Sequence, residues 1–336
     1  MWYLGTGTGV ITGSLLSYAF QHVNSTSLYS WQILFLVVGL MTVCIGTLVV
    51  FVLPDNPMKS RLSHDEKIWA IERLRENQTG IENKVFKPAQ VAECFMDPQT
   101  WLLILITISS SVPNGAVSSF QATLIKGFGY NSKQTALLQI PAGGVSIVSI
   151  LTATFLAGRY NQRALNVITL LIPGIVGGCL MAFLPADNKP GKLIGIYLTN
   201  CIGAMLPLLY SLVGANYAGH TKKGKLTVSV VVIASRLKCI ILVTMNAILL
   251  MSFCIGNIIG PLTFRAQDSP DYTPAKITII VACAIAVVLT AMLRVYYVWE
   301  NKRRDKLMEE TQMDHKVDIE FSDITDRMNK EFRYKY

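Results

Sequence analysis

The chain has 336 residues, of which 51% are hydrophobic and only 15% are charged, and its formal net charge is +9. Soluble domains carry roughly 25% charged residues, so this composition, with a mean hydropathy of +0.42, excludes a soluble protein and indicates one with several membrane spans. The basic residues gather mainly in two polar segments that flank apolar windows, so we expect a lipid bilayer as a partner and no nucleic acid.

Eight windows are apolar and long enough to cross a bilayer core, which is about 30 Å thick and needs about 20 residues of helix. They lie at Met1–Gln21, Ser30–Leu53, Trp101–Ile125, Ser132–Ala157, Leu165–Leu184, Leu193–Ala215, Val243–Phe264 and Ile277–Val298. The sequence therefore predicts an all-α membrane protein with eight transmembrane helices.

The first window carries glycines at a regular spacing. Gly5, Gly9 and Gly13 fall four residues apart, so they share one helix face, and small residues on a face allow a neighbouring membrane helix to approach closely. A phosphate-binding loop is the alternative for these glycines, but no strand precedes them. We therefore expect this face to be a helix contact.

The two polar segments predict the orientation in the membrane. Residues 54–97 carry seven Lys and Arg and residues 299–336 carry nine, whereas each link on the other side of the spans carries at most two. Basic residues favour the cytoplasmic side, so both segments, and with eight spans both termini, are predicted to be cytoplasmic. In the first segment Ser63 and Glu66 have the spacing of a capping box, which predicts the start of a helix.

One apolar stretch fits neither a span nor a solvated loop. Residues 222–246 read KKGKLTVSVVVIASRLKCIILVTMN. Arg236 and Lys238 would each cost roughly 2.5 to 3.5 kcal/mol at the centre of a span, and a ninth span would move the basic tail outside. Gly224–Leu242 can be encoded with an intron donor at one end and an acceptor at the other, and its removal keeps the reading frame. We interpret these 19 residues as a retained intron, with an ordinary variable insertion as the alternative.

Polar side chains inside the windows are the candidates for a binding site, because they are expensive in hydrocarbon and tend to face the bundle interior or a water-filled path. Asn114 and Gln121 lie seven residues apart on one helix face, beside a run of serines. The candidate cavity-lining residues for substrate binding are Asn114, Gln121, Gln139, Asn200, Tyr210, Asn246 and Asn257. The alternative for each is an interhelical hydrogen bond, worth about 0.6 kcal/mol.

Patterns typical of catalysis or metal binding are missing from the sequence. The four histidines lie in links or in the tail without metal-ligand or general-base spacing, so we predict no enzyme activity, no metal and no cofactor. No Asp or Glu lies in the middle of a window, although a proton-coupled carrier usually needs a titratable group in its path. We expect that group, and the basic residue that an anionic substrate requires, to come from further helices.

Several stretches carry a resemblance to a known family. They include DPQTWLL (97–103), SSSVPNGAVSSF (109–120), IKGFGYNSKQTALLQIPAGGVSI (125–147) and YYVWENKRRD (296–305). Over nearly its whole length, except Gly224–Leu242, the chain resembles the fungal allantoate permease family, in the anion:cation symporter branch of the major facilitator superfamily. The resemblance implies a plasma-membrane importer of a small organic anion, such as allantoate or a related ureide or carboxylate, with protons as the second partner.

The resemblance also implies a domain organisation. Members have twelve spans in two six-helix halves, and this chain begins where the fifth span would begin, so its eight helices correspond to the last eight of twelve. The implied domains are the last two helices of the N-terminal half (1–53), the cytoplasmic central linker (54–97), the C-terminal six-helix bundle (98–299) and a cytoplasmic tail (300–336). Alternating access is the implied mechanism. The remaining alternative is a non-functional fragment or a mis-spliced gene model of such a permease.

Overall fold

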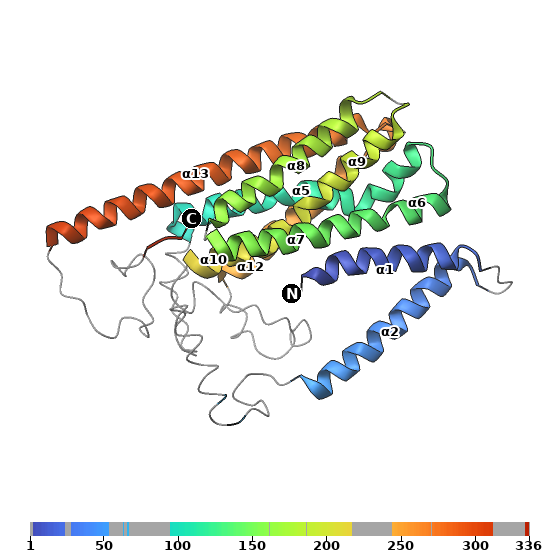
Figure 1. The fold of residues 1–336 in the computed structure, drawn as a ribbon, viewed down its shortest axis with the longest axis horizontal. Coiled ribbons are helices and arrows are strands. Elements are labelled where there is room, and N and C mark those ends of the chain that lie inside the picture. The colour runs from blue at the N-terminus through green and yellow to red at the C-terminus, as the bar shows by residue number, and fades with distance from the viewer. Residues whose placement is uncertain are drawn as a thin grey trace.

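The protein is helical throughout the part that the structure describes. The computed structural model describes residues 3–23, 28–53, 63, 66, 95–160, 162–185, 187–216, 244–269, 271–311 and 333–335. Every regular element in these ranges is a helix (Figure 1). Seven helical segments there are long and apolar enough to cross a membrane, and an eighth, α1 (Leu4–Phe20), has 17 residues. The prediction of an all-α membrane protein is therefore confirmed. The stretch Gly224–Leu242 and most of the linker 54–97 lie outside the described residues.

The helices after residue 97 pack side by side into one bundle (Figure 1). They are α5 (Pro98–Gly127), α6 (Ser132–Leu138), α7 (Ile140–Tyr160), α8 (Arg163–Phe183), α9 (Lys189–Thr199), the 3-10 helix η2 (Asn200–Ala204), α10 (Met205–Asn216), α12 (Thr244–Leu262), the short η4 (Ala266–Asp268) and α13 (Thr273–Thr311). Two of the predicted spans are interrupted, one at Gln139 between α6 and α7 and one at η2. The last helix continues beyond its apolar window to Thr311.

Local sequence signals explain where several helices begin. Asp97 precedes α5 and its carboxylate accepts a hydrogen bond from the Gln99 N–H at 3.3 Å, while Pro98 occupies the first turn, where a missing N–H costs nothing. Asn188 caps α9 in the same way, accepting from the Gly191 N–H at 3.0 Å. Within the segment 54–97, Ser63 and Glu66 exchange the two hydrogen bonds of a capping box, as their spacing predicts.

Glycine lets α5 and α12 approach each other closely. A Cβ atom added at Gly115 of α5 would lie 2.6 Å from the Asn257 Cα of α12. A Cβ added at Gly256 of α12 would lie 2.5 Å from the Ser111 Cβ and 2.6 Å from the Ile108 carbonyl oxygen. These distances leave no room for a side chain, so the two backbones meet directly. Close approach of this kind supports helix association where lipid weakens the hydrophobic drive.

The two N-terminal helices form a hairpin beside the bundle (Figure 1). α1 packs on α7, and the contact lies at Gly7 and Gly143: a Cβ at either residue would lie less than 3 Å from the carbonyl oxygen of the other. The predicted contact face of Gly5, Gly9 and Gly13 is wrong for the described residues, because a Cβ there would meet no atom within 4 Å. The face that packs is therefore turned away from the regular glycine repeat.

The second helix of the hairpin, α2 (Ser30–Val52), buries none of its residues. It runs from the end of α1 away from the bundle (Figure 1). Its exposed side chains are almost all apolar, including Phe35, Leu40 and Phe51. The described bundle leaves this apolar surface of α2 uncovered. In a membrane, where there is no water in the hydrocarbon core, the surface therefore faces lipid or other helices.

The end of the chain docks on the bundle where α10 ends. Asn216, the last residue of α10, donates to the Lys335 carbonyl at 2.7 Å and accepts from the Lys335 N–H at 2.6 Å. Asn301 of α13 makes the same pair of bonds with the Tyr334 backbone, at 2.8 and 2.9 Å. The Tyr334 ring stacks on Tyr297 with centroids 5.2 Å apart, and the ring is almost fully buried. The tail thus ties α13 to α10 at one end of the bundle.

Candidate functional site

Two predicted candidates, Asn114 and Asn257, meet between α5 and α12. The Asn114 Nδ2 atom donates to the Asn257 Oδ1 atom at 3.1 Å, although the residues are 143 positions apart in the sequence. The close backbone approach at Gly115 brings the two short side chains within reach. Asn257 also donates to the Phe253 carbonyl of its own helix at 2.8 Å. Both amides are half-buried, and Asn114 also lines a pocket.

A second amide pair joins α5 to the interrupted span. The Asn200 Nδ2 atom, at the start of η2, donates to the Gln121 Oε1 atom at 3.2 Å. The Asn200 carbonyl accepts from the Ser146 hydroxyl of α7 at 3.4 Å. Gln121 is 6% exposed, and its Nε2 atom is buried and has no hydrogen-bond partner among the described residues. An unpaired buried amide N–H costs about 1 to 3 kcal/mol, so this donor is available for an acceptor that enters the bundle.

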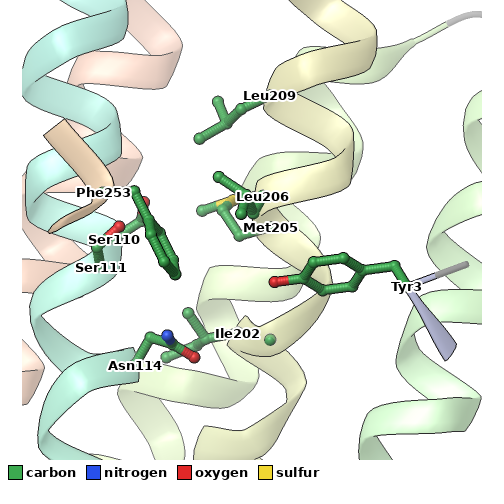
Figure 2. Close-up of a pocket in the computed structure, with 10 residues that line it drawn as sticks. Tyr3, Ser110, Ser111, Asn114, Ile202, Met205, Leu206, Leu209 and Phe253 are labelled. Carbon is green, nitrogen blue, oxygen red and sulfur yellow. The ribbon is translucent and has the colours of Figure 1, made fainter. Parts of the chain in front are cut away.

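A pocket opens beside Asn114, between α5, η2, α10, α12 and the residue that precedes α1 (Figure 2). Its cavity volume is about 10 Å³, roughly the space for one water molecule, and the pocket is partly open to solvent. Figure 2 shows the Asn114 amide and the Tyr3 hydroxyl pointing into this space from opposite sides. The lining residues are Tyr3, Ser110, Ser111, Asn114, Ile202, Gly203, Met205, Leu206, Leu209 and Phe253. The lining carries hydroxyl and amide groups and no formal charge.

The other three candidates are not brought into these clusters. Gln139 lies at the break between α6 and α7, where its side chain reaches back to the Thr135 carbonyl at 3.5 Å. Tyr210 of α10 and Asn246 of α12 are half-buried and do not line the pocket. Four of the seven predicted residues therefore form the two amide pairs, and one of these four, Asn114, also lines the pocket.

Sequence reasoning missed Tyr3 and Phe253, which line the pocket. It singled out polar residues in the middle of windows, whereas Tyr3 lies at the edge of the first window and Phe253 is apolar. The signal that could have found Tyr3 is its amphipathic nature, because a tyrosine can place its ring in apolar surroundings and its hydroxyl in a polar space. No comparable sequence signal marks Phe253.

Comparisons with known proteins agree with this architecture. The sequence model of the Major Facilitator Superfamily matches residues 1–261. The thiamine pathway transporter THI73 of Saccharomyces cerevisiae is 36% identical over 337 residues, covering 100% of this chain and 60% of the relative. Allantoate permease of the same yeast is 32% identical over 346 residues, covering 99% of this chain and 60% of the relative. The MFS-type transporter cnsL of Penicillium expansum is 35% identical, over 90% of this chain and 59% of its own length.

The matches cover nearly all of this chain but only part of each relative. The chain spans about 60% of the length of the curated relatives that it matches, so the substrates in their names belong to those longer proteins. The family match covers most of the chain, and the relatives are similar over nearly all of it. With its helical bundle and its membrane-spanning segments, the chain belongs to the major facilitator superfamily.

Proposed function

We propose that the protein acts in secondary active transport, importing a small organic anion such as allantoate or a related ureide or carboxylate, together with protons, across the plasma membrane. Support comes from membership of the major facilitator superfamily and from a similar protein that is named allantoate permease. Superfamily members of this kind work by alternating access, in which two helical halves rock around a site near the middle of the bilayer.

The observation that carries the proposal is the polar interior of an otherwise apolar bundle. Asn114, Asn257, Gln121 and Asn200 lie on three different spans, and they bond across the bundle rather than along a single helix. An amide offers both a carbonyl acceptor and N–H donors, which match the N–H and C=O groups of a ureide and the oxygens of a carboxylate. The unpaired Gln121 N–H supplies one donor that a substrate oxygen would satisfy.

The position of the pocket supports the same mechanism. Its lining comes from Tyr3, which precedes α1, and from the helices of the bundle. In the proposed organisation α1 belongs to one half of the transporter and the bundle to the other, so the pocket lies between halves that move. The neutral lining leaves proton coupling and charge recognition to groups outside the described pocket.

Uptake by living cells tests this proposal. Two forms of the protein would be expressed in a yeast strain that cannot take up allantoate: the chain alone, and a joined form in which the first four helices of yeast allantoate permease precede Met1. Membrane abundance would be measured for both. We expect saturable uptake of labelled allantoate or a related ureide by the joined form, and we expect a protonophore to abolish it.

The same experiment distinguishes the proposed transporter from the alternative, a non-functional fragment. If the joined form transports and the chain alone does not, the described helices are functional but need a partner half. If neither form transports any ureide or carboxylate although both reach the plasma membrane at normal abundance, the proposed function is wrong.

A further inference from the structure

Two buried lysines meet on one phenylalanine ring. The end of α5 and the starts of α9 and α13 lie at the end of the bundle opposite the docked tail (Figure 1). Phe128 follows the last turn of α5, Lys192 lies in the first turns of α9, and Lys276 lies in the first turns of α13. The Lys192 Nζ atom lies 5.5 Å from the centroid of the Phe128 ring, and the Lys276 Nζ atom lies 5.6 Å from it. A third cation, Lys189, lies 5.7 Å from the ring of Tyr130 nearby.

These lysines are buried without a matching carboxylate. Lys192 is 6% exposed and Lys276 is 3% exposed. In the part of the chain that the structure describes, neither ammonium group forms a hydrogen bond or an ion pair. The carboxylate of the exposed Asp271 attracts the Lys276 ammonium group, whereas the Lys192 ammonium group repels it. Buried lysines are almost always paired, so two unpaired ones around a single ring need an explanation.

Helix electrostatics add to the positive potential at this place. Both lysines are the fourth residue of their helices, α9 (Lys189–Thr199) and α13 (Thr273–Thr311). A helix N-terminus carries about half a positive charge, so an ammonium group there is unfavourable, whereas an anion there is stabilised. The Phe128 ring attracts each cation through its π face, an interaction worth about 0.5 to 2 kcal/mol, but it does not remove the repulsion between the two.

Each of the two lysines keeps a small exposed fraction near the start of its helix. Long basic side chains commonly bury their stems along apolar surface and present the ammonium group at a surface. An anion can reach this point without passing through the amide-lined interior.

We propose that Lys192 and Lys276, together with the N-termini of α9 and α13, form a binding site for one compact anion next to Phe128. Its ligand is either the carboxylate group of an organic acid or a free inorganic anion such as phosphate. The site is distinct from the Gln121–Asn200 pair, because Phe128 lies seven residues, or about two helical turns, beyond Gln121. It goes beyond the proposed function, since it needs neither transport nor a second half of the transporter.

Thermal unfolding of the purified chain in detergent tests the site. Circular dichroism of the helices would report unfolding while sodium acetate, or in a separate arm sodium phosphate, is added. We expect at least one of these anions to raise the Tm by about 3 °C at saturation, because a ligand that binds only the folded state stabilises it. The shift should be lost in Lys192→Gln and Lys276→Gln and kept in Lys133→Gln, which changes an exposed lysine at the same end of the bundle.

The Tm of Lys276→Gln without added anion distinguishes an anion site from a packing role. If the lysines serve an anion, Lys276→Gln removes repulsion and unfolds at or above the Tm of the unchanged protein. If they serve only the packing on Phe128, the variant unfolds at a lower Tm and the response to anions is the same in all four proteins, which would overturn the proposal.

Binding to the unchanged protein avoids any dependence on how the variants fold. Broadening of the phosphate ³¹P and acetate ¹³C resonances by the purified chain would be measured at millimolar anion, with each anion tested as a competitor of the other. Broadening of the acetate resonance alone would indicate a carboxylate site, and broadening of the phosphate resonance alone would indicate an inorganic anion site. Competition between the two anions would indicate a site that binds either. Absence of broadening for both anions would show that the site does not exist.

Discussion

Asn114 and Gln121 illustrate how single polar residues act inside an apolar bundle. Each lies on α5 and bonds an amide of another span, Asn114 to Asn257 and Gln121 to Asn200. In a membrane such a bond adds only about 0.6 kcal/mol to stability, because the separated helices find other partners. Stability alone is therefore a weak reason to place four amides there, and contact with a polar substrate is a stronger one.

Replacing either Asn114 or Gln121 with leucine should separate these two roles. In the joined form we expect each change to lower allantoate uptake at least about tenfold, which corresponds to about 1.4 kcal/mol of lost substrate interaction. Membrane abundance should change little, because the lost helix contact is small. Thr152→Val is the matched control, since the Thr152 hydroxyl is exposed and bonds only carbonyls of its own helix. A parallel fall of uptake and abundance would indicate a packing role instead.

At the scale of helices, the α5–α12 contact depends on backbone approach. Gly256→Ala should destabilise the protein by about 1 to 3 kcal/mol, because the new methyl group has no space between the Ser111 Cβ and the Ile108 carbonyl oxygen. Gly144→Ala is the control, since a Cβ at Gly144 on α7 meets no atom within 4 Å. Thermal unfolding in detergent would measure both. Equal Tm values for the two variants would contradict this packing.

The docked tail gives a second prediction for helices. The buried Tyr334 ring stacks on Tyr297, and its hydroxyl accepts a hydrogen bond from Arg304 at 3.0 Å. Tyr334→Ala removes both contacts and should therefore lower the free energy of unfolding by about 3 kcal/mol. Lys335→Ala should lower the stability little, because Asn216 bonds only the backbone of Lys335 and the Lys335 side chain is exposed. Limited proteolysis after residue 311 and the Tm would report the difference. A tail that is cleaved equally fast in all forms would contradict the docking.

Hydropathy predicted where the helices lie because a span in lipid needs an apolar run and little else. The window Trp101–Ile125 became α5 (Pro98–Gly127), and the Asp97–Pro98 start is readable from capping rules. The break at η2 could not be predicted, since Asn200–Ala204 contains no proline and only one glycine. The hydrogen-bond partners of Asn114 and of the tail could not be predicted either, because each pairing depends on how helices that are distant in the sequence pack together.

The packing face of α1 shows the same limit. A four-residue repeat identifies which glycines share a face, but it does not say which neighbour that face meets. In the described residues Gly7 meets Gly143, while Gly5, Gly9 and Gly13 meet nothing. Among the described residues, the small-residue contact of α1 therefore lies on a different face from the one that the spacing predicted.

For the whole molecule, the tail and the end of α10 lie on the same side of the bundle, because Lys335 bonds Asn216. With nine basic residues in the segment 299–336, that side should be cytoplasmic. A reporter that is active only in the cytoplasm, fused after Tyr336, should therefore be active. Activity of a reporter that works only outside the cell would contradict the orientation.

Deleting Gly224–Leu242 tests the interpretation of this stretch as a retained intron. Its 19 residues are too apolar for a solvated loop, and Arg236 and Lys238 are costly in a span. Removal should therefore leave expression and Tm unchanged or raise them. Sequencing of the transcript should show a junction between the codons of Lys223 and Val243. Loss of membrane insertion on deletion, or an unspliced transcript in every condition, would contradict the interpretation.

Counterflow in proteoliposomes tests the central claim, that these helices carry a small organic anion, most directly. Vesicles containing the purified joined form would be loaded with unlabelled allantoate and diluted into a trace of labelled allantoate, so that exchange is measured without metabolism or a proton gradient. We predict transient accumulation of label, which is lost in Gln121→Leu and kept in Thr152→Val. Vesicles that hold correctly folded protein and accumulate no label with allantoate, related ureides or carboxylates would contradict the account.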